Sequence, residues 1–525
     1  MNSSRILVID FGSQYSHLIC RRSRELNVFS ELCACTVNAE FVRSFNPTGI
    51  ILSGGPSSVY EAGSPHLDKS VWQLIDDSKI PVLGICYGLQ EMIYSHGGKV
   101  SPGNKREFGH ANLKVQNQDS PLFASLPPNF SVWMSHGDKV TDLGSDGFET
   151  IAVSDNSEMC AVVNKKRNFF GLQFHPEVTH TKFGLEILRN FIVNICGCSR
   201  EWTMKNFIQE EIDKIHQLVG PQKHVIGAVS GGVDSSVGAS LLHKALGERF
   251  HPILVDTGLL RLDEAKEVKS RLESHIPGLN LHVIDASEKY FTALTGVEDP
   301  EQKRKIIGNL FIQVFDETVH NVLKMDPSNC FLLQGTLYPD VIESVSYKGP
   351  SHTIKTHHNV GGLPEKMKMK IIEPFRLLFK DEVRQVGLEL GLHEDSVFRH
   401  PFPGPGLAIR IVGQITREYV NTLQLADAIY INELKASGEY KKIAQAFAVL
   451  LPTVKTVGIM GDCRTFESAL CLRAVESSDF MTADWYKMPY DLLGKISTRI
   501  VNEVKGINRV MYDVSSKPPS TIEFL

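Results

Sequence analysis

The sequence predicts an α/β protein with two doubly wound parallel-sheet domains followed by a smaller α+β C-terminal domain. Short apolar runs, each followed by helical periodicity, recur up to about residue 400, which is typical of parallel sheets covered by helices. The length of 525 residues also exceeds what a single hydrophobic core supports. We therefore expect domains over residues 1–200, 201–395 and 396–525.

The first domain is predicted from strand and helix patterns that begin near the N-terminus. The strand pattern RILVID (5–10) precedes a helical stretch over 14–26, and GIILSGG (49–55) precedes a helix near 67–77. The last helical stretch of this unit is FGLEILRNFIVNIC (183–196). A polar start and an amphipathic helix then lead to a new strand, which places the first boundary near residue 200.

The second domain repeats the strand signal with helical stretches between the strands. Its strand patterns are HVIGAVS (224–230), HPILVDTG (251–258), LHVIDAS (281–287) and NCFLLQGT (329–336). The domain is expected to end near residue 395, because RHPFPGPG (399–406) is too rich in proline and glycine for a helix or a central strand. That segment is either a linker or a rigid functional loop.

The third domain mixes helices and strands. A long amphipathic stretch over 417–438 is followed by strand-like patterns at 456–462 and 467–477, and then by a helix near 493–506. The resulting pattern is α+β. The two strand-like segments could support a dimer interface, or they could pack within their own chain.

Composition and charge exclude several classes of protein. The formal net charge of −5 gives no electrostatic footprint for nucleic acid, and no run of eighteen apolar residues predicts a membrane helix. The first residues lack the basic and apolar pattern of a signal peptide, so a cytoplasmic protein is expected. The ten cysteines form no CxxC pair and no zinc spacing, and most are expected to be small buried apolar residues.

A cysteine occupies the nucleophile position of a strand-to-helix turn in IPVLGICYGLQEM (80–92). Gly84 and Gly88 flank Cys86 at the spacing that permits a strained turn, with the thiol at a helix N-terminus. A base is offered by FHPEV, in which His175 and Glu177 point the same way in extended chain. Either motif alone is weak, because a lone cysteine in an apolar strand usually belongs to the core; together they favour a catalytic thiol.

The motifs LGICYG and FHPE resemble the class I glutamine amidotransferase family, which hydrolyses glutamine to glutamate and ammonia through a glutamyl thioester. The resemblance implies that Cys86 is the nucleophile, His175 the base and Glu177 its orienting partner. It also implies an oxyanion hole and a glutamine-binding set. The oxyanion amides would belong to Gly55 and Tyr87, and the glutamine contacts to Gln90, Ser135, His136 and Asp138.

The stretch SGGVDSS (230–236) lies between an apolar strand and a helical segment. Small residues let backbone amides approach an anion closely, and the helix N-terminus adds favourable partial charge. The loop is not a Walker A motif, because it has no lysine. It resembles the pyrophosphate loop of the ATP pyrophosphatases, which cleave ATP between the α and β phosphates and transfer AMP to a substrate oxygen.

That resemblance implies an ATP site that uses magnesium to neutralise the leaving pyrophosphate. Asp234 is either a metal contact or a helix cap. The residues assigned to ATP are Ser230, Gly231, Gly232, Val233, Asp234, Ser235, Ser236 and Asp256.

Four further stretches bear on which enzyme would join these two reactions. They are HHNVGGLP (357–364), RHPFPGPGLAIR (399–410), GDCRTFES (461–468) and the terminal KPPSTIEFL (517–525). Over the whole chain and in this order, they resemble the glutamine-hydrolysing GMP synthetase family. That family converts XMP to GMP through an adenylated XMP intermediate, with ATP cleaved to AMP and pyrophosphate.

The same resemblance implies two more sets of residues and a dimer. XMP contacts are expected from Arg304, Gln445, Arg509, Lys517, Ile522 and Glu523. Lys355, His357 and His358 would act catalytically on a lid over the nucleotides, although an exposed basic loop is the plainer interpretation of that segment. Asp340 and Glu343 are candidates to position the lid or the metal. The last third of the chain would form a homodimer interface.

Two other functions stay open at this point. One is a different glutamine-dependent ATP pyrophosphatase, such as an enzyme that makes NAD or asparagine. The other is a catalytically idle nucleotide sensor or scaffold. Because Cys86, His175, Glu177 and residues 230–236 are all present, the enzyme is favoured.

Overall fold

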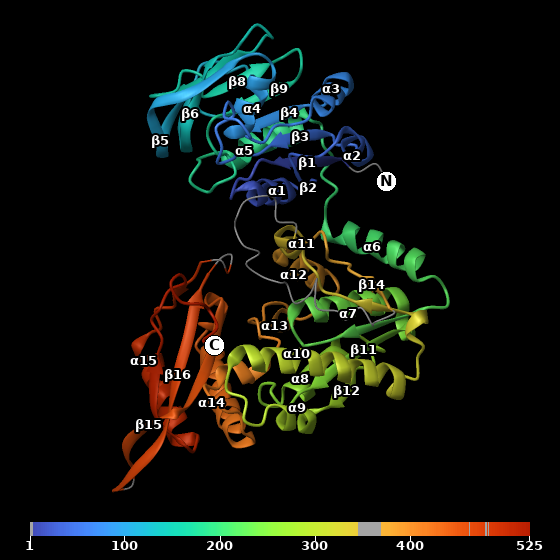
Figure 1. The fold of residues 1–525 in the computed structure, drawn as a ribbon, viewed down its shortest axis with the longest axis vertical. Coiled ribbons are helices and arrows are strands. Elements are labelled where there is room, and N and C mark those ends of the chain that lie inside the picture. The colour runs from blue at the N-terminus through green and yellow to red at the C-terminus, as the bar shows by residue number, and fades with distance from the viewer. Residues whose placement is uncertain (1–3, 345–368, 461, 478–479, 481) are drawn as a thin grey trace. The chain divides into compact units, whose positions relative to one another are not determined.

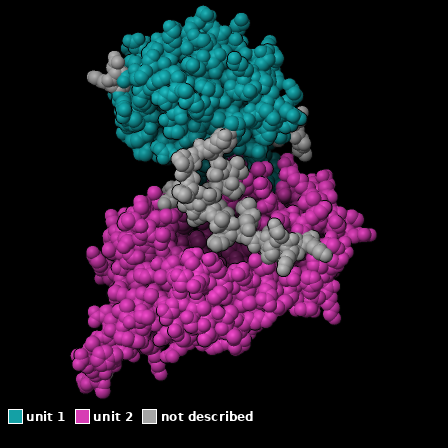
Figure 2. Space-filling view, viewed as in Figure 1, with its two compact units in different colours: residues 1–207, 346–350 teal, residues 208–345, 351–525 magenta. Residues whose placement is uncertain are grey.

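The computed structural model describes residues 4–344, 369–460, 462–477, 480 and 482–525. These divide into two compact units, one ending at Phe207 and the other beginning at Ile208 (Figure 2). No helix among them is both long and apolar enough to cross a membrane. The predicted boundaries near residues 200 and 395 remain predictions.

The first unit is built on a nine-stranded sheet with the order β2-β1-β3-β4-β9-β8-β7-β5-β6. Pairing is parallel from β2 through β9 and antiparallel from β9 through β6, so the sheet is mixed rather than wholly parallel. The strands are β1 (Arg5–Asp10), β2 (Phe29–Ala34), β3 (Gly49–Leu52), β4 (Val82–Ile85), β5 (Lys99–Val115), β6 (Asn129–Asp142), β7 (Glu149–Ser154), β8 (Ala161–Asn164) and β9 (Phe169–Leu172).

Helices cover the parallel part of this sheet (Figure 1). Side chains cap two of them at their N-termini, because Asn38 accepts from the amide of Phe41 and Asp68 accepts from that of Ser70. The buried strands β3, β4 and β9 have no polar face, as expected for strands covered on both sides. The helices are α1 (Ser16–Glu25), α2 (Ala39–Phe45), α3 (Lys69–Ser78), α4 (Tyr87–Ser95) and α5 (Gly184–Arg189); α6 (Met204–Val219) spans the division between the units.

The second unit begins with a wholly parallel sheet of order β12-β11-β10-β13-β14. The strands are β10 (His224–Ala228), β11 (Phe250–Asp256), β12 (His282–Asp285), β13 (Cys330–Leu333) and β14 (Lys370–Ile372). The helices are α7 (Val233–Leu246), α8 (Glu264–His275), α9 (Ser287–Ala293), α10 (Pro300–Glu317), α11 (Tyr338–Ser344), α12 (Lys380–Glu389) and α13 (Glu394–Val397).

A second sheet, formed by β15 to β18, follows in the same unit. Strands β15 (Gln445–Met460) and β16 (Cys463–Glu476) pair antiparallel, and β16 also pairs with β17 (Asp484–Trp485) and β18 (Ile507–Tyr512). Helix α14 (Arg417–Ala436) packs along β15, and α15 (Tyr490–Glu503) packs on α14 and β18 (Figure 1). Two α/β parts with parallel strands and an α+β C-terminal part confirm the predicted fold class.

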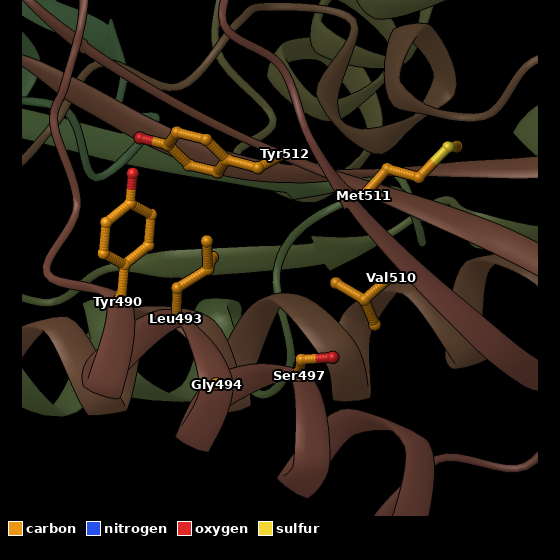
Figure 3. Close-up of a pocket in the computed structure, with 7 residues that line it drawn as sticks. All are labelled: Tyr490, Leu493, Gly494, Ser497, Val510, Met511 and Tyr512. Carbon is orange, nitrogen blue, oxygen red and sulfur yellow. The ribbon is translucent and has the colours of Figure 1, made fainter.

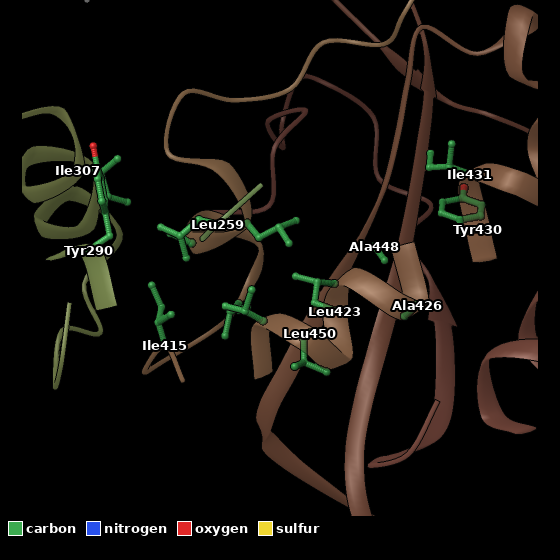
Figure 4. Close-up of a cluster of buried hydrophobic side chains, with 14 of the residues drawn as sticks. Leu259, Tyr290, Ile307, Ile415, Leu423, Ala426, Tyr430, Ile431, Ala448 and Leu450 are labelled. Carbon is green, nitrogen blue, oxygen red and sulfur yellow. The ribbon is translucent and has the colours of Figure 1, made fainter. Parts of the chain in front are cut away.

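The proline-rich segment 399–406 enters the core of the second unit at Gly406. Gly406 has φ +62°, and a Cβ there would collide with the carbonyl oxygen of Leu259; the next amide, that of Leu407, donates to this oxygen at 2.8 Å. Leu259 and Leu407 belong to one apolar cluster that also contains residues of α10, α14 and β15 (Figure 4). The segment is therefore a packed connection and not a free linker.

Histidines lie in the first two residues of three neighbouring strands, at the edge of the parallel sheet opposite the 230–236 loop. His224 Nδ1 lies 2.9 Å from His251 Nε2, and the rings of His251 and His282 are 6.5 Å apart. Burial, with the neighbouring His224 and His282, lowers the pKa of His251 to about 4. The folded protein therefore favours a neutral His251.

We expect this histidine to make the second unit less stable in acid. Between pH 6.5 and about 4 the unfolded chain binds a proton that the folded protein rejects, so stability falls as the pH falls through that window. Thermal unfolding of His251→Gln should depend less on pH there than that of the wild type. The exposed His320→Gln serves as the control, and an unchanged pH dependence in His251→Gln would contradict this account.

Candidate active sites

Cys86 lies on a sharp turn between β4 and α4. Its φ of +52° and ψ of −104° lie outside the regions that non-glycine residues usually adopt, a form of strain that concentrates at active sites. The backbone is held in place because the Cys86 amide donates to the carbonyl oxygen of Leu172 at 2.7 Å. The thiol is buried at the start of a helix, at the positive end of the helix dipole.

The two glycines beside Cys86 are needed for close packing. A Cβ at Gly84 would lie 2.5 Å from the carbonyl oxygen of Gly88, and one at Gly88 would collide with the carbonyl oxygen of Leu52. The spacing of these glycines thus follows from the approach of α4 to the strands β3 and β4.

His175 and Glu177 form a buried pair next to Cys86. Nδ1 of His175 donates to Oε1 of Glu177 at 2.8 Å, and the Glu177 side chain is wholly buried. Burial lowers the pKa of His175, but the charges of Glu177 and of the Cys86 thiolate outweigh that effect and raise it to about 11. At neutral pH the imidazole is therefore protonated, the form that stabilises a thiolate.

The loop that carries this pair is attached to β6 through Trp133. The amide of His175 donates to the carbonyl oxygen of Trp133 at 3.0 Å, and the amide of Trp133 donates to the hydroxyl of Thr181. The Thr181 hydroxyl in turn donates to the carbonyl oxygen of His175 at 2.6 Å. These bonds fix the imidazole relative to the strand that contains Ser135.

The residues predicted to contact glutamine come together around Cys86. The thiol lies 3.7 Å from the carbonyl oxygen of Ser135, and the Gln90 amide donates to the carbonyl oxygen of Asp138 at 3.1 Å. His136 Nδ1 donates to the same Asp138 oxygen at 2.9 Å. The structure thus gathers all four residues at one place.

Two side chains at this site were missed by the sequence reasoning. Gln173, fully buried, has its amide nitrogen 3.8 Å from the Cys86 sulfur; it precedes His175 by two residues, so strand alternation could have indicated it. Glu107 has Oε2 3.0 Å from Nε2 of His136, and both side chains are buried. No local signal connects Glu107 to that site.

The predicted oxyanion residues lie close to the thiol and its base. A Cβ at Gly55 would lie 3.2 Å from Cγ of Tyr87, and one at Gly54 would lie 3.1 Å from Cε1 of His175. Tyr87 is the first residue of α4, so its amide is not used by the helix ladder.

The 230–236 loop joins β10 to α7 and is held by its own hydroxyls. The Ser230 amide donates to Oγ of Ser235 at 3.2 Å, and that hydroxyl donates to the carbonyl oxygen of Gly232 at 3.1 Å. Gly231 has φ +74°, and a Cβ there would collide with Val268. The buried hydroxyl of Ser236 has no hydrogen-bond partner in the described part of the chain.

The structure supplies a lysine to this loop from far along the sequence. Lys380, the first residue of α12, forms an ion pair with Oδ2 of Asp234. Arg399 donates to the carbonyl oxygen of Gly231 at 3.1 Å. The loop itself lacks a lysine, as the sequence shows, but its surroundings are cationic.

Asp234 also fits the role of a magnesium ligand. Its Oδ1 is buried and has no hydrogen-bond partner among the described residues. In that part of the chain no three His, Cys, Asp or Glu side chains are arranged to hold a metal. Mg²⁺ is commonly bound by one or two carboxylates together with substrate phosphates, so the open Oδ1 of Asp234 beside the loop fits this ion.

The other residues predicted for the ATP site are only partly described. Asp256 ends β11 at the same edge of the sheet as the loop, and its side chain accepts from the amide of Gly258 at 2.9 Å. Asp340 accepts from the amide of Leu337 at 2.9 Å near the start of α11. Lys355, His357 and His358, and the Glu343 side chain, lie outside the described residues.

Some of the predicted XMP contacts meet at the C-terminal tail. Gln445 donates to Oε1 of Glu523 at 2.6 Å, and Arg304 donates to the carbonyl oxygen of Leu525 at 2.5 Å. Lys517 donates to the carbonyl oxygen of Phe480, and Arg509 lies on β18. No recorded contact brings Lys517 or Arg509 to Glu523.

Two buried arginines that the sequence reasoning missed hold this tail. Arg473 donates to the carbonyl oxygens of Ser515, Thr521 and Ile522 at 2.8–2.9 Å. Arg410 forms two bonds to the Glu523 carboxylate. Both arginines lie in apolar runs, where the pattern predicts only core residues.

A pocket of about 270 Å³ lies between α15 and β18 and contains none of the predicted site residues (Figure 3). It is lined by Tyr490, Leu493, Gly494, Ser497, Val510, Met511 and Tyr512.

Comparison with known proteins identifies the family of this chain. Residues 7–195 match the family model Glutamine amidotransferase class-I, and residues 432–524 match GMP synthase C terminal domain. A Kluyveromyces lactis protein named GMP synthase (glutamine-hydrolyzing) is 55% identical over 99% of this chain and 98% of its own length. Proteins with the same name from Phaeosphaeria nodorum and Saccharomyces cerevisiae are 55% and 54% identical over 99% of this chain, and over 96% and 97% of their own lengths. Because such similar relatives match over nearly their whole length, the chain belongs to the glutamine-hydrolysing GMP synthase family.

Proposed function

We propose that this protein makes GMP from XMP, with ammonia released from glutamine in the first unit and with ATP consumed in the second. The observation that carries the proposal is the buried Cys86–His175–Glu177 arrangement, in a chain whose other unit has a phosphate-type loop at a helix N-terminus. Glutaminase and adenylating chemistry together make a ligase that forms a C–N bond with glutamine as the amide donor.

The glutaminase step follows from the geometry around Cys86. The thiolate attacks the side-chain carbonyl carbon of glutamine, and the amides of Gly55 and Tyr87 stabilise the oxyanion. The protonated His175 gives its proton to the departing ammonia, which leaves a glutamyl thioester. Neutral His175 then takes a proton from water, the hydroxide attacks the thioester, and glutamate and the free thiol are released.

The adenylating step uses the loop after β10. An oxygen of the XMP base attacks the α phosphorus of ATP, pyrophosphate leaves, and ammonia then displaces AMP to form GMP. The loop amides and the hydroxyls of Ser235 and Ser236 bind the leaving phosphates, while Lys380 and Asp234 lie beside them. Bound Mg²⁺, held by Asp234 and the phosphates, would neutralise charge on the pyrophosphate.

The remaining assignments are parts of the same proposal. XMP would be held by Arg304, Gln445, Arg509, Lys517, Ile522 and Glu523. Lys355, His357 and His358 would act from the lid, and Asp340 and Glu343 would position the lid. Asp256 would contact ATP. We also propose a cytoplasmic homodimer. Support for the dimer comes from apolar side chains exposed on the C-terminal sheet and α15: Ile459 is 81% exposed, Phe466 61% and Tyr490 89%.

The direct test is pyrophosphate release from ATP with XMP, magnesium and either glutamine or ammonia. Turnover that depends on XMP supports the proposal. Turnover with deamido-NAD or aspartate in place of XMP would assign the protein to another glutamine-dependent ATP pyrophosphatase.

Replacing the nucleophile should separate the two nitrogen sources. In Cys86→Ala, glutamine-dependent GMP formation should be lost, while formation from added ammonia should remain near the wild-type level, because only the thioester step is removed. Cys463→Ala, which changes an exposed cysteine, is the control. Loss of both activities in Cys86→Ala would show that the turn serves folding instead of catalysis.

Replacing Asp234 should impair adenylation. In Asp234→Ala, ammonia-dependent pyrophosphate release should fall about 100-fold or more, because the carboxylate proposed to hold Mg²⁺ at the leaving pyrophosphate is removed. Asp395→Ala is a matched control, because Asp395 also lies in the first turn of a helix of the second unit and is 74% exposed. Equal losses in both variants, or none in Asp234→Ala, would contradict the assignment.

A further inference from the structure

Arg410 is a buried cation at the end of the packed proline-rich segment. Its side chain has no exposed surface, and it ends the 3₁₀ turn Gly406–Arg410. The guanidinium lies over the ring of Phe447 at 4.1 Å and near that of Phe402 at 5.1 Å. These aromatic contacts leave the planar group little freedom to turn.

The hydrogen bonds of Arg410 go to a single carboxylate. Nη2 donates to Oε1 of Glu523 at 2.8 Å, and Nε donates to Oε2 at 3.2 Å. Nη1 is buried and has no hydrogen-bond partner among the described residues. The Arg410 side chain therefore binds Glu523 through two parallel hydrogen bonds, a bidentate geometry that among side chains only arginine provides.

The bonds at Glu523 leave one acceptor position open. A carboxylate has about four lone-pair sites, two on each oxygen. Oε1 accepts from both Arg410 and Gln445, whereas among the described residues Oε2 accepts from Arg410 alone. The Glu523 side chain remains 22% exposed, so a ligand can approach it.

We propose that Arg410 is a positioning residue that orients Glu523 so that Oε2 accepts one N–H of the XMP purine ring. This rests on the proposed function, in which Glu523 contacts the substrate. Besides any direct contact with XMP, Gln445 then has a second role, because its amide occupies the remaining acceptor position on Oε1 of Glu523. The carboxylate can consequently accept a hydrogen bond from one N–H group of the base and not from two.

The test uses ammonia-dependent GMP formation, which needs no glutaminase activity. In Arg410→Lys the charge is kept but the paired bonds are lost, so the KM for XMP should rise about tenfold or more, as for loss of a charged hydrogen bond. The KM for ATP should stay unchanged. Arg261→Lys is the matched control, because Arg261 packs on the same Phe402 ring at 5.2 Å but pairs with Asp427.

A double-mutant cycle shows whether Arg410 acts through Glu523. Arg410→Lys should change the KM for XMP little when Glu523→Gln is already present. Additive effects, or an equal rise in Arg261→Lys, would overturn the proposal. If Arg410→Lys fails to fold, Arg410→Gln replaces it in the cycle, with the same non-additivity expected.

Methylated substrates test the single open position. In the wild type, methylation at N1 or at N3 of XMP should raise the KM. In Glu523→Gln we expect this rise to be smaller at one of the two positions only. A smaller rise at both positions, or at neither, would overturn the proposal. A wild-type protein without XMP-dependent pyrophosphate release would instead disprove the proposed function, so the two failures are distinguishable.

Discussion

Both candidate sites depend on one constraint, which is that a helix must begin directly beside the end of a buried parallel strand. At Cys86 this requires glycines at 84 and 88, because any side chain there would meet backbone oxygens. At the 230–236 loop it requires Gly231 in a left-handed conformation against Val268. In each unit, close packing brings unused helix amides to the edge of the sheet, where they can meet an oxyanion or a phosphate.

The charges at the thiol site are also mutually dependent. Glu177 is fully buried, and its Oε2 has no hydrogen-bond partner among the described residues, so its charge is compensated chiefly by His175. Contact with Cys86 adds to the raised pKa of His175. In the proposed mechanism, formation of the thioester would remove the negative charge at Cys86 and so lower the pKa of His175 when the reaction next needs a base.

The sequence predicts site residues that lie close together in the chain, and it misses contacts between residues that lie far apart in the chain. Cys86 with its glycines, His175 with Glu177, and residues 230–236 each lie within one strand–turn–helix or loop, so local spacing together with the family resemblance could indicate them. The lysine at the phosphate loop comes from residue 380, and Glu107 reaches His136 from another strand. The mixed sheet of the first unit was not predicted either, because strand alternation does not specify the direction of the partner strand.

The C-terminal tail shows why such distant contacts matter. A glutamate near the end of a chain has little to hold it in place, and a mobile carboxylate discriminates poorly between base edges. Here Arg473 bonds the tail backbone and Arg410 bonds the carboxylate, so the tail acquires the order of the core to which it is attached. Burying two arginines costs solvation, which the paired bonds and aromatic contacts offset. That cost is reasonable if the proposed role of Glu523 holds, because an acceptor with one open position can select a base only if its direction is fixed.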